Sequence, residues 1–241
     1  MNFLSRSAAA LSCLLLTTGR AAPAQTADYL AAVEALCRVE WPKNRTVTVV
    51  CHGHSVPAGY FKTPAVNALE AYPHHLRRGL AAAFPHAVIN VIVTAVGGEN
   101  AEQGAARFEA DVLSLRPDVV TIDYALNDRR IGLERSRAAW TAMIQQALAR
   151  GIKVILLTPS PDLGAAMTDP ADPLAQHAAQ VTQLAQSYEV GLADSFAAFQ
   201  TFAAGGGNLT TLMSQRNHPN EAGHRLIADR LIPWFVEPPP H

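Results

Sequence analysis

The sequence lacks a charge bias: its 241 residues carry 19 Lys and Arg against 20 Asp and Glu, a formal net charge of −1. It also lacks any run of five or more basic residues. Nucleic-acid-binding domains usually present a strongly basic face, so we expect no nucleic-acid partner and favour a small or neutral molecule. With 49% hydrophobic and 16% charged residues, the chain has enough apolar material for one sizeable core.

Long apolar runs are absent after the first two dozen residues, so no later segment is predicted to span a bilayer. Within those first residues, Arg6 precedes a short apolar stretch over Ala8–Leu16, and Ala22-Pro23-Ala24 follows it. A basic start, a short apolar stretch and a small-residue cleavage site are typical of a secretory signal peptide. We therefore expect a leader over residues 1–24, a single domain over residues 25–241, and a secreted or periplasmic protein.

Cysteine is scarce, and removing the leader leaves only Cys37 and Cys51. An oxidising compartment permits a disulfide between them. The position of Cys51 at the end of a predicted core strand instead favours buried thiols, because free cysteine there behaves as a small hydrophobe. Cys51, His52 and His54 lie within four residues, but no further metal ligands are evident, so we expect neither a metal nor a cofactor.

Strand-like and helix-like segments alternate along the rest of the chain. Continuous β-branched or apolar runs, typical of strands buried on both faces, cover 46–51, 87–94, 118–123, 152–158 and 190–193. Helical periodicity covers 73–84, 102–115, 133–150, 173–188 and 221–235. This order predicts an α/β fold, with helices on both sides of a five-stranded parallel sheet.

In a parallel sheet, ligands bind beyond the carboxyl ends of the strands, so candidate catalytic residues should follow strands directly. Ser55 follows the first predicted strand within Gly53-His54-Ser55, and Gly98 follows the second. Asn127 and Asp128 follow the third, and His218 lies just before the last predicted helix. We expect Asp128 to order the loop that carries Asn127 through local hydrogen bonds, without contact to substrate.

On these four blocks the chain resembles the SGNH (GDSL-type) hydrolases, over essentially all of residues 25–241. The resemblance implies a flavodoxin-like three-layer α/β/α sandwich. It assigns Ser55 as the nucleophile, His218 as the base, and Gly98 and Asn127 as oxyanion-hole residues. The chemistry agrees with this, since a serine hydroxyl becomes nucleophilic when an imidazole accepts its proton. The N–H groups of Ser55 and Gly98, with the amide of Asn127, suit a developing oxyanion. We further expect a glycine at position 98 because close backbone approach leaves no room for a Cβ atom.

The chain departs from the family pattern at three positions. His54 stands where the family usually has Asp, and Ala125 stands where it usually has Gly. Gln215 lies three residues before His218, where the family usually places the third member of the triad, an Asp. A neutral amide can orient the ring through its oxygen but cannot stabilise the imidazolium as a carboxylate does.

Three interpretations of Gln215 follow. In the first, which we favour, Ser55 and His218 work as a dyad and the ring is oriented by Gln215 or a backbone carbonyl. In the second, another carboxylate substitutes, with Asp123 and Asp194 near strand ends as candidates, although Asp194 is better placed to cap a helix. In the third, most of the activity has been lost.

The resemblance implies a secreted serine esterase that cleaves small-molecule or glycan esters, with short acyl groups such as acetyl on carbohydrates as substrates. The alternatives are a lysophospholipase or thioesterase of the same superfamily, and a catalytically impaired binding protein. An α/β-hydrolase architecture is disfavoured, because the segment Gly53-His54-Ser55-Val56-Pro57 does not fit the Gly-x-Ser-x-Gly elbow of that fold. The sequence does not indicate an oligomeric state.

Overall fold

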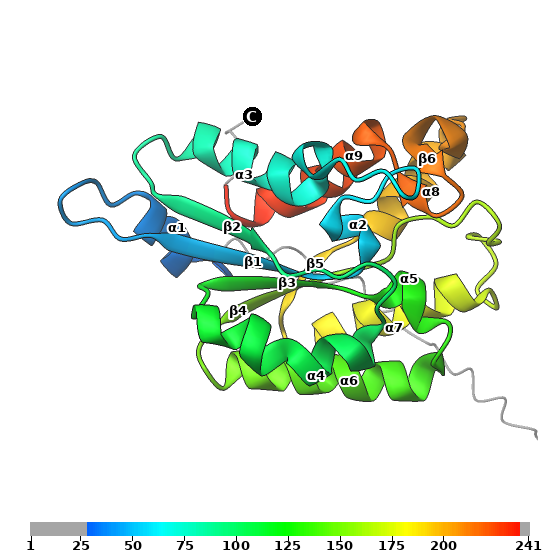
Figure 1. The fold of residues 1–241 in the computed structure, drawn as a ribbon, viewed down its shortest axis with the longest axis horizontal. Coiled ribbons are helices and arrows are strands. Elements are labelled where there is room, and N and C mark those ends of the chain that lie inside the picture. The colour runs from blue at the N-terminus through cyan, green and yellow to red at the C-terminus, as the bar shows by residue number, and fades with distance from the viewer. Residues whose placement is uncertain (1–27, 237–241) are drawn as a thin grey trace, which may run out of the picture.

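The computed structural model describes residues 28–236, so the leader predicted over residues 1–24 lies outside the described residues. A five-stranded sheet runs through the centre of the described region in the order β2-β1-β3-β4-β5 (Figure 1). All four neighbouring pairs are parallel. The strands are β1 (Val47–Gly53), β2 (Ile89–Val93), β3 (Val119–Asp123), β4 (Lys153–Leu157) and β5 (Gly191–Ala193). The predicted α/β fold class is confirmed.

Helices cover both faces of the sheet, as the buried β-branched strands require. On one side lie α3 (Tyr72–Ala83), α8 (Ser195–Ala204) and α9 (Glu221–Leu231) (Figure 1). On the other lie α4 (Ala101–Asp111), α6 (Gly132–Leu148) and α7 (Pro173–Ser187). A further helix, α1 (Ala31–Cys37), precedes β1 and contacts it. None of the helices within residues 28–236 is long and apolar enough to cross a membrane.

Two predicted helices end four residues earlier than their periodicity indicated, at 111 rather than 115 and at 231 rather than 235. The segment predicted over 102–115 is helical only to Asp111, and a separate 3₁₀ turn covers Leu113–Leu115. The last helix ends at Leu231 and continues as a 3₁₀ turn over Ile232–Trp234. The second break has a direct cause, because Pro233 has no N–H group to continue the helical hydrogen bonds.

Several elements went unpredicted because they are short or lack a clear period. They include α1, α8 and a small antiparallel hairpin, β6 (Met213–Gln215) with β7 (His218–Pro219). Two single-turn helices, α2 (Ser55–Ala58) and α5 (Ala125–Asp128), directly follow β1 and β3. In Figure 1, α2, α5 and β6 gather at one end of the sheet. The loops that carry the candidate residues therefore meet at the carboxyl ends of the strands.

The two cysteines are separate, buried thiols. Both belong to the apolar cluster on the α3 and α9 side of the sheet. Burial raises the pKa of the Cys37 thiol to about 11, so this group stays protonated and packs as a small hydrophobe.

Asp128 is fully buried and joins three elements. Its Oδ1 accepts a hydrogen bond from the backbone N–H of Ala101 at 2.8 Å, at the start of α4. Its Oδ2 accepts from Ser136 Oγ at 2.8 Å and Trp140 Nε1 at 2.7 Å, both on α6. Asp128 therefore holds the Asn127 turn through partners on two neighbouring helices, and the prediction of local hydrogen bonds is wrong.

Replacing Asp128 with Ala should lower the free energy of unfolding by about 2 to 4 kcal/mol, because it leaves buried donors on Ala101, Ser136 and Trp140 without an acceptor. Urea denaturation followed by tryptophan fluorescence measures this change. The matched control is Glu109→Ala, which removes only an exposed ion pair with Arg150 and should have little effect. Equal losses in the two variants would contradict the structural role of Asp128.

Candidate active site

Ser55 begins the single turn α2 immediately after β1 and is 8% exposed. His54 caps this turn, with its Nδ1 accepting the backbone N–H of Val56 at 3.2 Å. The N–H of His54 in turn donates to the carbonyl of Asp123 at 3.2 Å, which ties the turn to the end of β3. The hydroxyl of Ser55 is thereby presented at the carboxyl edge of the sheet.

His218 meets Ser55 across the edge of the sheet. It lies on β7 just before α9, and its Nε2 is 2.9 Å from Ser55 Oγ although 163 positions separate the two residues. The ring is 5% exposed. This separation suits proton transfer from a hydroxyl to an imidazole.

The other ring nitrogen of His218 has two neighbours. The carbonyl oxygen of Phe61 lies 2.9 Å from Nδ1, and Nε2 of Gln215 lies 2.8 Å from it. A carbonyl only accepts, so a proton on Nδ1 satisfies Phe61 and leaves the lone pair of Nε2 free for Ser55. This is the tautomer that a general base requires.

Gln215 does not hold the ring through its oxygen. Its Oε1 accepts the backbone N–H of Thr63 at 3.0 Å, and since an N–H only donates, this contact fixes which end of the amide faces His218. The amide nitrogen therefore points at Nδ1, which differs from the expected oxygen contact. As a donor it competes with Phe61 for Nδ1 and favours the opposite tautomer.

Burial lowers the basicity of His218. Desolvation lowers the pKa of its imidazole below the ordinary value, and the hydrogen bond to Phe61 offsets part of this. The neighbouring His54 lowers the pKa further. The ring is therefore neutral, and able to accept a proton, at lower pH than an exposed histidine.

Neither alternative carboxylate serves His218. Asp194 caps α8, with its Oδ1 accepting from the N–H of Ala197 at 3.0 Å and from Thr158 Oγ1 at 2.8 Å. Asp123 is buried at the end of β3, where its Oδ1 lies 3.3 Å from His54 Nε2 and its Oδ2 accepts from the hydroxyl of Tyr72 at 3.3 Å. The expected capping role of Asp194 is confirmed. Asp123 contacts His54 and Tyr72 rather than His218.

Gly98 lies on the exposed loop after β2 with a φ of +82°, in the left-handed region. A Cβ atom there meets nothing within 4 Å, so backbone conformation rather than lack of space explains the glycine. The expected crowding occurs one residue earlier, because a Cβ on Gly97 would lie 2.9 Å from the ring of Tyr60. The loop is joined to β1 by the N–H of Val96, which donates to the carbonyl of Gly53 at 3.0 Å.

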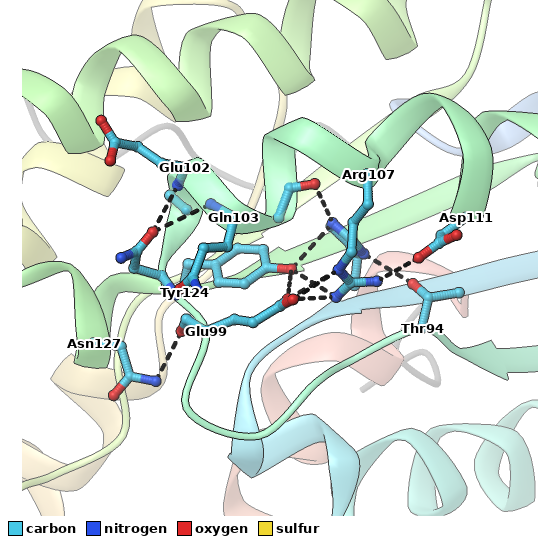
Figure 2. Close-up of polar contacts among 12 residues, drawn as sticks. Thr94, Glu99, Glu102, Gln103, Arg107, Asp111, Tyr124 and Asn127 are labelled. Atoms are coloured by element: carbon cyan, nitrogen blue, oxygen red, sulfur yellow. Dashed lines mark hydrogen bonds and ion pairs between the residues drawn. The ribbon is translucent and has the colours of Figure 1, made fainter.

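Asn127 lies in α5, directly after β3, and is 8% exposed. Its Nδ2 donates to the backbone carbonyl of Glu99 at 2.8 Å, as Figure 2 shows. Since the amide nitrogen carries two hydrogens, one orients the side chain and the other remains for a ligand. The roles of Glu99 and Phe61 could not be predicted from the sequence, because both accept hydrogen bonds through backbone oxygens, which every residue has.

Comparisons with known proteins bear on the family and the fold of this chain. A model of the GDSL-like Lipase/Acylhydrolase family matches residues 51–226. A search of curated proteins finds no match. An acetylxylan esterase from Geobacillus stearothermophilus superposes with a TM-score of 0.68 and 23% identity, covering 78% of this chain and 94% of that one.

A two-domain esterase active on acetylated mannans superposes with a TM-score of 0.70 and 21% identity, covering 86% of this chain. The match covers 52% of that esterase, so the chain spans about half of its length. At such low identity the superpositions show a shared fold, and the family model extends over most of the chain. The chain therefore belongs to the GDSL-like lipase/acylhydrolase family and is a serine hydrolase of ester bonds.

Proposed function

We propose that this enzyme removes short acyl groups, acetyl above all, from carbohydrates through an acyl-Ser55 intermediate. The observation that carries the proposal is the 2.9 Å contact between Ser55 Oγ and His218 Nε2, with a carbonyl acceptor 2.9 Å from the opposite ring nitrogen. We further propose that the protein is exported, on the strength of the leader predicted over residues 1–24.

In the first half of the reaction, Ser55 Oγ attacks the ester carbonyl while His218 Nε2 takes the hydroxyl proton. The carbonyl oxygen becomes an oxyanion, which the N–H groups of Ser55 and Gly98 and the second hydrogen of Asn127 Nδ2 stabilise. As the first residue of α2, Ser55 has an N–H with no intrahelical acceptor. Collapse expels the sugar alkoxide, which takes the proton from His218 and leaves the acyl group on Ser55.

In the second half, a water molecule gives its proton to His218 Nε2 and attacks the acyl carbonyl. The same donors hold the second oxyanion. Collapse then breaks the bond to Ser55 Oγ, which recovers its proton from His218, and releases the carboxylic acid. The Phe61 carbonyl keeps the proton of Nδ1 in place throughout, so the ring uses only Nε2 for transfer.

A hollow of about 460 Å³ beside the site supports a carbohydrate substrate. Asn127, a candidate oxyanion donor, and Asn217, the neighbour of His218 in the chain, line it, and much of the rest is charged. Those charged residues are Arg129, Arg130, Asp162, Asp172 and Arg216. Such a lining suits hydroxyl groups better than the long alkyl chain of a lysophospholipid or acyl thioester, which needs apolar contact. The acetylated substrates named for the two structural neighbours point the same way.

A second candidate function, a binding protein with impaired turnover, is favoured by one observation. Gln215 Nε2 faces His218 Nδ1 at 2.8 Å as a donor, which favours a proton on Nε2 rather than on Nδ1. In that tautomer His218 donates to Ser55 and cannot activate it. The variants below separate the two functions.

Ser55→Ala should lower kcat/KM for p-nitrophenyl acetate at least about 1,000-fold, because the nucleophile is lost. Mass spectrometry should find a fluorophosphonate adduct on Ser55 in the wild type and none in the variant. Ser114→Ala, a change on an exposed surface position, is the control and should keep wild-type activity. Absence of Ser55-dependent cleavage and labelling in the wild type would favour the binding protein.

Gln215→Glu should raise kcat on the order of 10-fold, since the isosteric carboxylate accepts from both Thr63 N–H and His218 Nδ1–H and stabilises the imidazolium. Steady-state kinetics of the variant at its own pH optimum measure the effect, with Gln183→Glu on α7 as a control for the added charge. A collapse of kcat in Gln215→Glu alone would show that the neutral amide is required.

The acid limb of the wild-type kcat/KM profile should lie below about 6.5, the ordinary pKa of histidine. The sign follows from burial: the lowered pKa keeps His218 neutral, and active as a base, further into acid. In Gln215→Glu the added carboxylate favours the protonated ring, so the limb should move to higher pH. Kinetics at constant ionic strength test both shifts, and a limb that is identical in the two proteins would contradict the contact between residue 215 and His218.

A further inference from the structure

Behind the Gly98 loop, the carboxylate of Glu99 is held by Arg107 of α4 (Figure 2). Nε of Arg107 donates to Oε1 and Oε2 at 3.1 and 2.9 Å, and Nη2 donates to Oε2 at 2.7 Å. The side chain of Arg107 is 18% exposed and that of Glu99 is 15% exposed. A partly buried guanidinium fork of this kind is stronger and more directional than an exposed ion pair.

Tyr124 closes this arrangement from the side of the sheet. Its hydroxyl lies 3.2 Å from Arg107 Nη2, 3.5 Å from Glu99 Oε2 and 3.1 Å from Nε2 of the buried His52. The ring is fully buried, and a Cβ on Gly104 would lie 2.3 Å from its Cζ. Glycine at 104 therefore lets α4 approach closely enough for Arg107 to reach both partners. We call Glu99, Arg107 and Tyr124 the loop clamp.

The loop clamp reaches the candidate oxyanion hole through the backbone of Glu99. The carbonyl of Glu99 accepts the hydrogen bond from Asn127 Nδ2 at 2.8 Å, and Glu99 directly follows Gly98. Its side chain and its main chain are thus anchored at the same time. Gly97 and Gly98 themselves are exposed, so the anchorage lies one residue further along the chain.

We propose that the loop clamp is a positioning element for catalysis, which holds the N–H of Gly98 and the amide of Asn127 where the oxyanion forms. The inference rests on the proposed function. Arg107 touches no reacting atom in this scheme and acts only through Glu99. Preorganised donors stabilise a transition state because they need not reorganise when charge develops, and a displacement of about 1 Å can cost about 100-fold in rate.

The test compares Arg107→Met with Arg135→Met. Arg135 of α6 pairs with Glu102 of α4, and the two side chains are 61% and 37% exposed. This control therefore removes an ion pair to α4 that has no contact with the loop clamp. The readouts are kcat and KM for p-nitrophenyl acetate, the inhibition constant of phenylboronic acid, which adds to the serine hydroxyl as a tetrahedral anion, and the urea midpoint.

In Arg107→Met we expect kcat to fall by on the order of 10- to 100-fold, with KM within about 2-fold of the wild type. Phenylboronic acid should bind more weakly by a comparable factor, because it depends on the same donors. Arg135→Met should match the wild type in kcat, KM, boronate affinity and urea midpoint. Arg107→Lys should recover part of kcat, since an ammonium restores the charge but not the fork.

Equal kcat in Arg107→Met and Arg135→Met, or a loss of kcat with unchanged boronate affinity, would overturn the inference. If Arg107→Met does not fold, Tyr124→Phe and Glu99→Gln replace it, and wild-type kcat in both would overturn it equally. These outcomes differ from failure of the proposed function, in which the wild type itself shows no Ser55-dependent hydrolysis and the inference falls with it.

Discussion

In the proposed mechanism, the contact between His218 Nδ1 and the carbonyl of Phe61 governs the chemistry of the site, because it favours the tautomer in which Nδ1 carries the proton. The carbonyl is well placed to impose this choice. The N–H of Phe61 donates to Ala65 at 3.1 Å, and the N–H of the preceding residue, Tyr60, donates to the carbonyl of Ser55 at 3.0 Å. Ser55 and the Phe61 carbonyl are therefore parts of one short hydrogen-bonded segment.

A buried histidine supports this segment from α9. The ring of His224 stacks on Phe61 with centroids 5.1 Å apart, and its Nδ1 accepts the backbone N–H of Tyr72 at 3.2 Å. Burial lowers the pKa of His224 to about 3. The ring therefore remains neutral at physiological pH, and the stack brings no positive charge toward His218.

Much of this site was predictable from side-chain types and the position of strands. In a parallel sheet the residues that follow β1, β2 and β3 meet at one edge, so Ser55, Gly98 and Asn127 are found from the sequence once the strands are recognised. The carbonyl that accepts from His218 could not be predicted, because every residue carries a carbonyl. Only the folded path of residues 59–66 brings that of Phe61 to the ring. The orientation of Gln215 escaped for a related reason. It is set by the N–H of Thr63, 152 positions away.

The neutral acceptor has a consequence for the rest of the catalytic arrangement. In the proposed mechanism, acyl transfer develops two charges together, an imidazolium on His218 and an oxyanion on the substrate. A backbone carbonyl stabilises the first by a dipole, which is weaker than the full charge of an aspartate. Stabilisation of the oxyanion can then lower the barrier more than stabilisation of the imidazolium, since oxyanion donors act at a fixed position in a partly desolvated site. The Arg107 guanidinium contributes to stabilisation of the oxyanion rather than of the imidazolium, because its charge-assisted bonds hold Glu99 and not the ring of His218. In the proposed mechanism, precise placement of the oxyanion donors compensates for a triad without its carboxylate.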